Sequence, residues 1–352
     1  GADVVGGNYT SASPEVSVLL GADFETIGWH LYAAGDINVD GKEEIIMQDG
    51  DTGGEPNCNI MTGLTRIGTV TGAYSDSDVC GWSVAEGDLN GDGISDLVFS
   101  DGSYNYASGA GNGWGVLGQL GRTSINLSTD SAFTYIGGTS SSGAGNPLIG
   151  DFDGDGFDDL LMTAEMEDSE SYVVDAGAGY LLNGEVVASG ALDGKRLVYG
   201  YESSLKETGD VSAMTLGVSV VYGGVTGARV ANSMAVITDP SCTFGNEKDD
   251  EPRTVVSSWI LGTTAYDNLG AIFNVTSRAM ASKSGSNVIM TVSDEADQSI
   301  YGDGHGFSEA FAVGDFDGDG LQDLAASTPG YDSDEDGEDI CLISTYQTYR
   351  SK

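Results

Sequence analysis

The stretch Gly150-Asp151-Phe152-Asp153-Gly154-Asp155-Gly156-Phe157-Asp158-Asp159-Leu160 decides the fold predicted for this chain. Carboxylates occupy positions 1, 3, 5 and 9, counted from Asp151, and position 6 is Gly. Hard cations such as Ca²⁺ bind about six to eight oxygen ligands, mostly carboxylates and carbonyls. Gly at position 6 permits the sharp turn that brings alternate side chains onto one ion. The stretch is therefore predicted to be a nine-residue calcium loop, in which position 7 offers its carbonyl.

Close copies of this loop occur at Gly35–Ile45, Gly87–Leu97 and Gly314–Leu324, which predicts about four structural Ca²⁺ ions. The predicted side-chain ligands at positions 1, 3, 5 and 9 are Asp36, Asn38, Asp40, Glu44, Asp88, Asn90, Asp92, Asp96, Asp151, Asp153, Asp155, Asp159, Asp315, Asp317, Asp319 and Asp323. The predicted carbonyl ligands at position 7 are those of Lys42, Ile94, Phe157 and Leu321.

An EF-hand loop shares the first half of this pattern but requires a bidentate Glu at position 12 and a helix on each side. Position 12 is Met47, Phe99, Met162 and Ala326 in the four copies, so it supplies no ligand. The residues after each loop form a short apolar run, which is typical of a buried strand. The loops are therefore expected to join strand to strand.

The composition indicates a folded, strongly acidic protein. The chain has 352 residues, 54 of them Gly and 39% hydrophobic, which suits a fold of short strands and tight turns. Its net charge is −42, and four Ca²⁺ ions would leave about −34. Such a surface repels nucleic acid and anionic membranes, which excludes both as partners. It indicates either a salt-adapted solvated surface or a contact with a basic partner.

Four cysteines favour disulfides and an oxidising compartment, because none forms a C-x-x-C pair and neither His lies near them. Cys58–Cys80 with Cys242–Cys341 is the favoured pairing among the three that are possible, and buried free thiols are the alternative. No apolar run is long enough to span a bilayer. The opening, Ala2-Asp3-Val4-Val5, reads as a strand, which predicts a mature chain or an excised portion of a longer one.

The loops recur at a spacing that fits propeller blades. Their first Asp residues are 36, 88, 151 and 315, so the gaps are 52, 63 and 164 residues. The last gap equals three steps of about 55, which predicts two degenerate, metal-free repeats within it. A repeat of this length fits a four-stranded blade.

Each clear repeat shows the same order of parts. A strand leads into the loop, the short apolar strand follows it, and two further strands complete the unit, as at 113–119 and 65–70. Strands are also expected at 218–222, 230–238, 254–261, 271–275 and 287–292. The prediction is one all-β domain over 1–352, a seven-bladed β-propeller with blades at 1–27 (partial), 28–75, 80–138, 144–202, 205–245, 252–300 and 305–352. C-terminal residues would complete the partial blade and close the ring, which removes exposed edges.

The run Cys80-Gly81-Trp82-Ser83-Val84-Ala85-Glu86-Gly87-Asp88-Leu89-Asn90-Gly91-Asp92-Gly93-Ile94-Ser95-Asp96-Leu97 resembles an FG-GAP repeat, the blade of the integrin α-subunit propeller, and 305–324 and 144–161 are similar. The resemblance implies calcium loops between the first two strands of a blade, on the face opposite the ligand-binding face, and so a structural role for the metal. The first copy departs from the family at Val39 (position 4) and Glu44 (position 9), which puts its affinity in question.

The sequence favours a non-enzymatic, extracellular or cell-surface protein that binds a protein partner, mediates adhesion or assembles with itself. No G-x-S-x-G, Walker or H-E-x-x-H motif is present, so no catalytic residue is predicted. Tyr104 and Tyr106 are the candidate ligand-binding residues, because family analogy places their connection on the binding face; the alternative is packing within the loop. A propeller lectin that binds glycan and a polysaccharide-active hydrolase or lyase with scattered carboxylates are the alternative functions.

Overall fold

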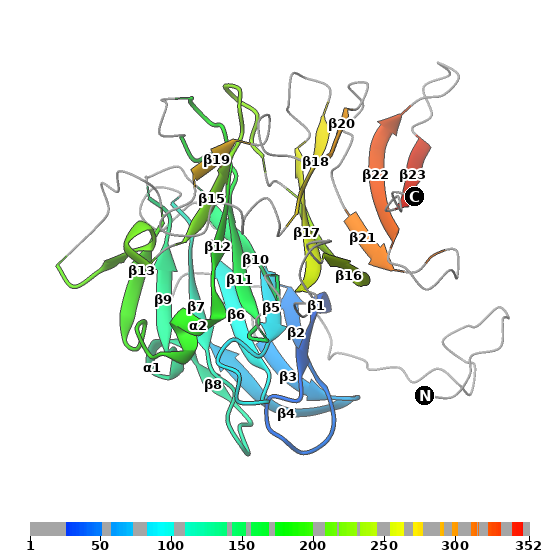
Figure 1. The fold of residues 1–352 in the computed structure, drawn as a ribbon. Coiled ribbons are helices and arrows are strands. Elements are labelled where there is room, and N and C mark those ends of the chain that lie inside the picture. Colours follow the sequence, from blue (N-terminus) through cyan, green and yellow to red (C-terminus); the bar gives the residue numbers. More distant parts are fainter. Residues whose placement is uncertain are drawn as a thin grey trace, which may run out of the picture.

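The structure, a computed structural model, describes residues 26–50, 58–72, 83–101, 110–138, 143–152, 156–168, 173–199, 208–216, 218–230, 233–244, 254–263, 270–276, 289–291, 298–301, 311–314, 316, 323–331 and 340–347. These residues form an all-β fold of five sheets with a few short helices (Figure 1). The prediction of an all-β class is confirmed.

The first sheet begins with an antiparallel four-stranded blade that carries the first loop. Its strands are β1 (Thr26–Gly35), β2 (Glu44–Gly50), β3 (Cys58–Thr62) and β4 (Thr65–Thr71), with the two-residue β8 (Ile125–Asn126) at the outer edge. Loop 1, Asp36–Glu44, connects β1 to β2, and Glu44 is also the first residue of β2. The apolar run after the loop is therefore a strand, as predicted.

The second sheet repeats this arrangement around loop 2, Asp88–Asp96. Its blade consists of β5 (Ser83–Gly87), β6 (Asp96–Asp101), β7 (Asn112–Val116) and β9 (Phe133–Ile136), followed outward by β13 (Lys195–Val198) and β14 (Val211–Ser212). All six residues of β6 are buried, because both faces of this strand are covered. Such double burial explains the continuous apolar run after the loop.

The third sheet contains loop 3, Asp151–Asp159, between its first two strands. Its strands are β10 (Ala144–Gly150), β11 (Asp159–Ala164), β12 (Ala178–Leu182), β15 (Ser219–Tyr222) and β19 (Ile289–Thr291). The connection from β12 to β15 is long and holds α2 (Gly184–Ala188), β13, β14 and the 3₁₀ helix η2 (Ala213–Leu216). This insertion separates the third strand of the blade from the fourth by more than thirty residues, on the order of a whole short blade.

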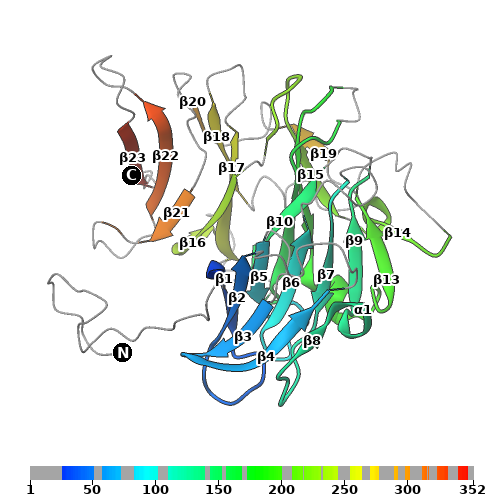
Figure 2. The same ribbon diagram turned by 180° about the vertical axis from the view of Figure 1, so that it is seen from behind.

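Two further sheets complete the described fold. The fourth has the strands β16 (Ser233–Phe244), β17 (Thr254–Thr263), β18 (Ala271–Thr276) and β20 (Gln298–Tyr301), all antiparallel. The fifth has β21 (Phe311–Gly314), β22 (Asp323–Tyr331) and β23 (Ile340–Gln347). Figures 1 and 2 show these two sheets beside one another at one side of the molecule.

The predicted division of 205–300 into two metal-free blades is wrong for the residues that the structure describes. The predicted strands do exist there, but β15 is the fourth strand of the third blade, and β16 pairs with β17 across the predicted boundary at 245–252. The residues assigned to an extra blade form the long β12–β15 insertion and the twelve-residue strand β16. The described strands thus make five blades, and the predicted partial blade at 1–27 lies almost entirely outside the described residues.

A regular feature connects neighbouring blades. β8, β13 and β19 each lie in sequence between the third and fourth strands of one blade, and each pairs in parallel with the outer strand of the blade before it, β4, β9 and β15 respectively. A strand edge that already has a partner is unavailable for pairing with another chain. The connections therefore cover the outer edges of the first three blades.

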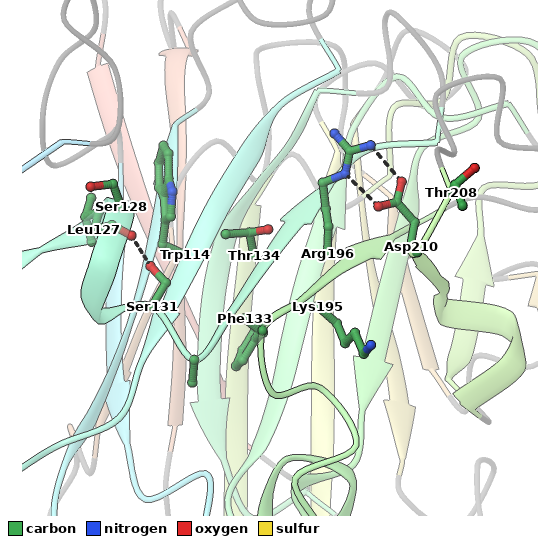
Figure 3. A pocket seen from close by; sticks show the side chains of 13 residues that line it. Trp114, Leu127, Ser128, Ser131, Phe133, Thr134, Lys195, Arg196, Thr208 and Asp210 are labelled. Carbon is green, nitrogen blue, oxygen red and sulfur yellow. Dashed lines mark hydrogen bonds and ion pairs between the residues drawn. The ribbon is translucent and has the colours of Figure 1, made fainter.

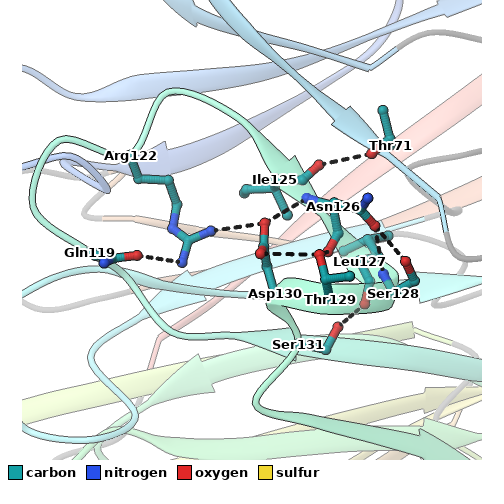
Figure 4. Close-up of polar contacts among 10 residues, drawn as sticks. All are labelled: Thr71, Gln119, Arg122, Ile125, Asn126, Leu127, Ser128, Thr129, Asp130 and Ser131. Carbon is teal, nitrogen blue, oxygen red and sulfur yellow. Dashed lines mark hydrogen bonds and ion pairs between the residues drawn. The ribbon is translucent and has the colours of Figure 1, made fainter.

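Figure 4 shows how the first of these connections is held. Thr71 on β4 donates a hydrogen bond from its hydroxyl to the carbonyl of Ile125, over 3.3 Å. Asn126 caps the short helix α1 (Leu127–Asp130) by accepting from the N–H of Ser128, and its own N–H donates to Asp130. Arg122 forms an ion pair with the same Asp130 at 3.4 Å. The connection is thus ordered by its own polar groups as well as by β4.

The hydrophobic core lies between consecutive blades. One cluster joins Ile46 and Ile60 of the first blade to Phe99 and Trp114 of the second. Comparable clusters join the second blade to the third, the third to the fourth and the fourth to the fifth. Trp114 packs between blades, and nothing is described for the side chains of the other three Trp residues. Face-to-face packing of successive sheets is the arrangement of a propeller.

Candidate cation-binding loops

Loop 2 is folded around its own carboxylates. Asp88 accepts hydrogen bonds from the main-chain N–H groups of Asp92 (3.0 Å) and Gly93 (2.8 Å). Asn90 accepts from Asp92 N–H at 2.9 Å, and Asp92 accepts from Ile94 N–H at 2.9 Å. The side chains at positions 1, 3 and 5, which are Asp88, Asn90 and Asp92, therefore accept hydrogen bonds from the backbone of their own loop.

Loop 1 has the same bonding. Asp36 accepts from the N–H groups of Asp40 (3.0 Å) and Gly41 (2.9 Å), and Asp40 accepts from Lys42 N–H at 3.0 Å. The position-6 glycines Gly41 and Gly93 have φ values of 85° and 82°. Only a residue without Cβ reaches that conformation cheaply, so the predicted need for Gly at position 6 is met.

The closing carboxylates at position 9 are the most informative groups in the two loops. Glu44 and Asp96 are 1% and 0% exposed. One oxygen of each is engaged, since Glu44 Oε1 accepts from the Thr62 hydroxyl at 2.8 Å and Asp96 Oδ1 accepts from Gly118 N–H at 2.7 Å. The other oxygen, Glu44 Oε2 or Asp96 Oδ2, is buried and has no partner in good hydrogen-bond geometry, and the same holds for Oδ1 of Asn38. The main-chain N–H groups of Ile37 and Asn90 interact with the two carboxyls only closely enough to lower their pKa. A buried polar atom without a partner requires an explanation, and a bound cation is one.

Burial has an electrostatic consequence for both closing carboxyls. It raises the pKa of Asp96 to about 7, with Asp92 and Asp88 adding to the shift and the Gly118 hydrogen bond opposing it. Burial also raises the pKa of Glu44, with Asp40 and Asp36 contributing in the same direction. Three carboxyls in each loop thus lie close enough to repel one another. A cation would remove that repulsion.

Loop 3 is described in part. Asp151 accepts from Gly156 N–H at 3.2 Å, and Gly156 has a φ of 93°. Asp159 is fully buried and accepts from Phe152 N–H at 3.1 Å and Gly184 N–H at 2.8 Å. Loop 3 therefore shares with loops 1 and 2 the hydrogen bond from the position-6 N–H to the position-1 carboxylate, and the left-handed Gly at position 6.

Several predicted residues lie outside the part of the chain that the structure describes. They are Asp153, Asp155, Asp315, Asp317, Asp319, Leu321, Tyr104, Tyr106 and Cys80. Asp323 begins β22, but its side chain is not described. Cys58 is buried in β3. The fourth loop, the candidate tyrosines and the disulfide pairings stay predictions.

No three acidic, His or Cys side chains among the described residues lie close enough to hold a metal ion by themselves. A cation in loop 1 or loop 2 would therefore also need the Asn amide at position 3 and the main-chain carbonyl at position 7. Oxygen ligands of this mixed kind are those that Ca²⁺ accepts. The residues present fit such an ion in chemistry and burial.

Position 2 of each loop is a feature that the sequence reading missed. Ile37, Leu89 and Phe152 are buried and pack into the cores toward the following blade. An apolar residue at this position in all four copies is the signal that identifies it. It anchors loops 1 to 3 to the blade interface, which is a structural role, whereas Phe316 at the same position of the fourth copy is 51% exposed.

A pocket of about 650 Å³ lies on the outer part of the second sheet, beside α1 (Figure 3). Cross-strand partners Trp114, Thr134 and Arg196 form a row along its floor. Arg196 binds Asp210 through two hydrogen bonds, of 3.2 and 2.7 Å. At the sheet edge, Asp210 neutralises the charge of Arg196. The pocket exists because β13 and β14 extend this sheet beyond the four strands of its blade.

A sequence model of the FG-GAP repeat matches residues 146–182 and 307–339. The first match covers loop 3 and the strands β11 and β12, and the second covers the fourth loop, Asp315–Asp323. No curated protein shows a significant match to the chain. Within the described residues, no helix has the length and apolar character needed to cross a membrane. The resemblance that the sequence indicated is confirmed at these two places.

Proposed function

We propose that this FG-GAP repeat protein is a non-enzymatic, extracellular calcium-binding β-propeller that mediates protein–protein interaction, adhesion or surface assembly. FG-GAP repeats support a propeller that binds protein. The single observation that carries the calcium proposal is the pair of buried, unpartnered oxygens, Glu44 Oε2 and Asp96 Oδ2, at the closing positions of two loops. The predicted disulfides belong to the same extracellular proposal.

The residues that would hold the ion are those at positions 1, 3, 5, 7 and 9 of each loop. Asp88, Asn90, Asp92 and Asp96 would supply side-chain oxygens in loop 2, and Ile94 its carbonyl. Bound Ca²⁺ would supply positive charge and oxygen coordination. Because loops 1 to 3 each join the first two strands of a blade, the ion would fix the corner of that blade.

Calorimetric titration with Ca²⁺ tests this proposal. About four ions should bind, and the melting temperature should rise with Ca²⁺ by mass action, since the unfolded chain does not form the loops. A matched control is the Lys195→Gln variant, which changes an exposed charge on β13 and should bind the same number of ions. An unchanged melting temperature after exhaustive chelation would contradict the structural role of the metal.

The interaction role needs a separate experiment. Analytical ultracentrifugation in Ca²⁺ and in chelator should detect self-association, and a surface-immobilised chain should capture a protein partner from its native surroundings. The net charge of −42 favours a partner with a basic surface, so the association should weaken as salt is added. A strictly monomeric chain with hydrolytic turnover on polysaccharide would overturn the non-enzymatic proposal.

The pocket beside α1 favours a second candidate function, binding of a saccharide. It combines the edge of Trp114, the hydroxyls of Ser128, Ser131 and Thr134, and the paired charges of Arg196 and Asp210. The lining is mainly polar, and hydroxyl and charged groups of this kind can form hydrogen bonds with the hydroxyls of a saccharide. A glycan array should give hits that Arg196→Ala abolishes and Lys42→Gln, a change in loop 1, retains. An array without hits would remove this candidate.

A further inference from the structure

Loops 2 and 3 contact each other through a residue that is not itself a predicted ligand. Asp158 occupies position 8 of loop 3, and its Oδ2 accepts a hydrogen bond of 2.7 Å from the main-chain N–H of Asp88. The N–H of Asp158 in turn donates to the carbonyl of Asp88 at 3.3 Å. Asp88 is position 1 of loop 2. The two loops are thus joined at Asp88, which is the first predicted ligand in the sequence of loop 2.

The two loops are tightly packed around this contact. A Cβ on Gly87 would lie 2.2 Å from Ile149 Cγ2 and 2.8 Å from Asp158 Oδ2. A Cβ on Gly91, at position 4 of loop 2, would lie 2.5 Å from Cε1 of Phe157. The start and the middle of loop 2 therefore pack closely against loop 3 and the strand before it, so the conformation of one loop depends on that of the other.

The corresponding contact between loops 1 and 2 has a different chemistry. Ser95 occupies position 8 of loop 2, and a Cβ on Gly35 would lie 2.1 Å from its hydroxyl oxygen. No hydrogen bond joins Ser95 to loop 1 among the residues that the structure describes. Packing is common to both pairs of loops, whereas the carboxylate hydrogen bond is particular to Asp158. Ser95 therefore provides a natural comparison at the same position.

We propose that Asp158 is a positioning residue for the cation site of loop 2, and that Ca²⁺ binding to loops 2 and 3 is cooperative through it. The inference rests on the proposed calcium binding. Asp158 lies between Phe157 and Asp159, which are predicted ligands of loop 3, so an occupied loop 3 holds Asp158 in place. Asp158 then holds the backbone of Asp88, which lowers the entropic cost of ordering loop 2 around its own ion.

Three substitutions of Asp158 and Ser95 test the positioning role by calorimetric Ca²⁺ titration. Asp158→Ser installs the residue that the chain itself carries at position 8 of loop 2, and its hydroxyl is too short to reach Asp88. It should weaken one further site besides that of loop 3, by about tenfold, which matches loss of a hydrogen bond to a charged group. Asp158→Asn keeps an acceptor oxygen and should bind nearly as the unaltered chain does. Ser95→Ala is the matched control and should change no site by more than about twofold.

Two background variants separate an effect on loop 2 from an effect on loop 3. In Asp151→Asn, where loop 3 lacks its first ligand, Asp158→Ser should still weaken a remaining site, but by less than in the unaltered chain, because an empty loop 3 holds Asp158 less firmly. In Asp88→Asn, where loop 2 is disabled, the same change should have a much smaller effect. The opposite pattern, with the effect lost in the first background and kept in the second, would overturn the positioning role. Circular dichroism of each variant checks that the sheets are intact.

The outcome also distinguishes this inference from the proposed function. If the unaltered chain released no heat with Ca²⁺, both would be overturned. If it bound Ca²⁺ at independent sites, with Asp158→Ser acting on loop 3 alone, only the coupling would be overturned. A steeper binding curve for the unaltered chain than for Asp158→Ser supports the coupling.

Discussion

Loops 1 and 2 reach the same geometry with different residues at two positions. At position 9, Asp96 takes a hydrogen bond from a main-chain N–H of Gly118, whereas the longer Glu44 takes one from the side chain of Thr62. At position 4 both loops have a left-handed backbone, with φ of 72° at Gly91 and 61° at Val39. A β-branched residue in that conformation is strained, and Gly is not.

The difference shows which parts of the pattern are essential. Both loops keep a buried closing carboxylate and a left-handed Gly at position 6. Loop 3 shares these two features, although both oxygens of its Asp159 accept main-chain hydrogen bonds. The identity of the closing acid varies because a different neighbour meets it. Position 4 also varies, and Val39 in loop 1 raises the energy of the left-handed backbone that Gly91 adopts without strain in loop 2. We therefore expect loop 2 to bind Ca²⁺ more tightly than loop 1.

Replacement of the closing carboxylate should have the largest effect. Asp96→Asn keeps an oxygen for Gly118 and removes the charge, so the affinity of loop 2 for Ca²⁺ should fall by about hundredfold or more. In chelator the same variant should melt higher than the unaltered chain at pH 8, because no buried ionised group remains. Glu44→Gln should act in the same two directions in loop 1. Equal Ca²⁺ binding by Asp96→Asn and the unaltered chain would show that loop 2 holds no ion.

The pKa of Asp96 predicts opposite pH dependences with and without Ca²⁺. In the calcium-free protein the pKa of about 7 exceeds the unfolded value near 4, so the folded state retains the proton. Stability in chelator is then greatest below about pH 4 and declines as the pH rises to about 7. Ca²⁺ requires the ionised group, so the rise in melting temperature produced by Ca²⁺ should grow over the same range. Scanning calorimetry from pH 4 to 8 tests both trends, and Asp96→Asn should flatten them.

Exchange of the residues at position 4 should have a smaller effect on stability. Gly91→Ala places a Cβ 2.5 Å from Cε1 of Phe157 at a positive φ, which should cost about 2 kcal/mol. Val39→Gly relieves strain at an exposed site and should stabilise the fold by about 0.5 kcal/mol. Urea denaturation in chelator measures both. A destabilised Val39→Gly would mean that Val39 is not strained.

The smallest effect is expected at the hydrogen bond that is particular to loop 1. Thr62→Val preserves shape and removes the donor to Glu44 Oε1, which should cost about 1 kcal/mol. Ca²⁺ affinity should fall at the loop 1 site and remain unchanged at the other sites. Thr65→Val, at an exposed position on the neighbouring strand β4, is the matched control. An effect on several sites would indicate that Thr62 acts on the blade as a whole.

Much of the fold was predictable because its signals are local. The acidic loops, their glycines and the apolar runs after them identify the first two strands of each blade that carries such a loop, from about eleven consecutive residues. The curled backbone of loops 1 and 2 agrees with the sequence pattern, since Asp36 and Asp88 each accept main-chain hydrogen bonds from their own loop, while metal binding by these residues stays a prediction. The partners Thr62 and Gly118 were not predictable, because each is at least eighteen residues away from the carboxylate that it meets.

The sequence by itself determined the class of fold, the FG-GAP repeats and the residues of the candidate cation loops, because repeated short motifs carry that information. Only the tertiary structure decided how residues 205–300 are shared between blades, since a strand such as β15 is assigned by its pairing partner and not by its own pattern. It also decided that β8, β13 and β19 cover the edges of preceding blades, and that Asp158 contacts Asp88. Long-range pairing depends on what lies beside a segment in space, and local sequence does not record it.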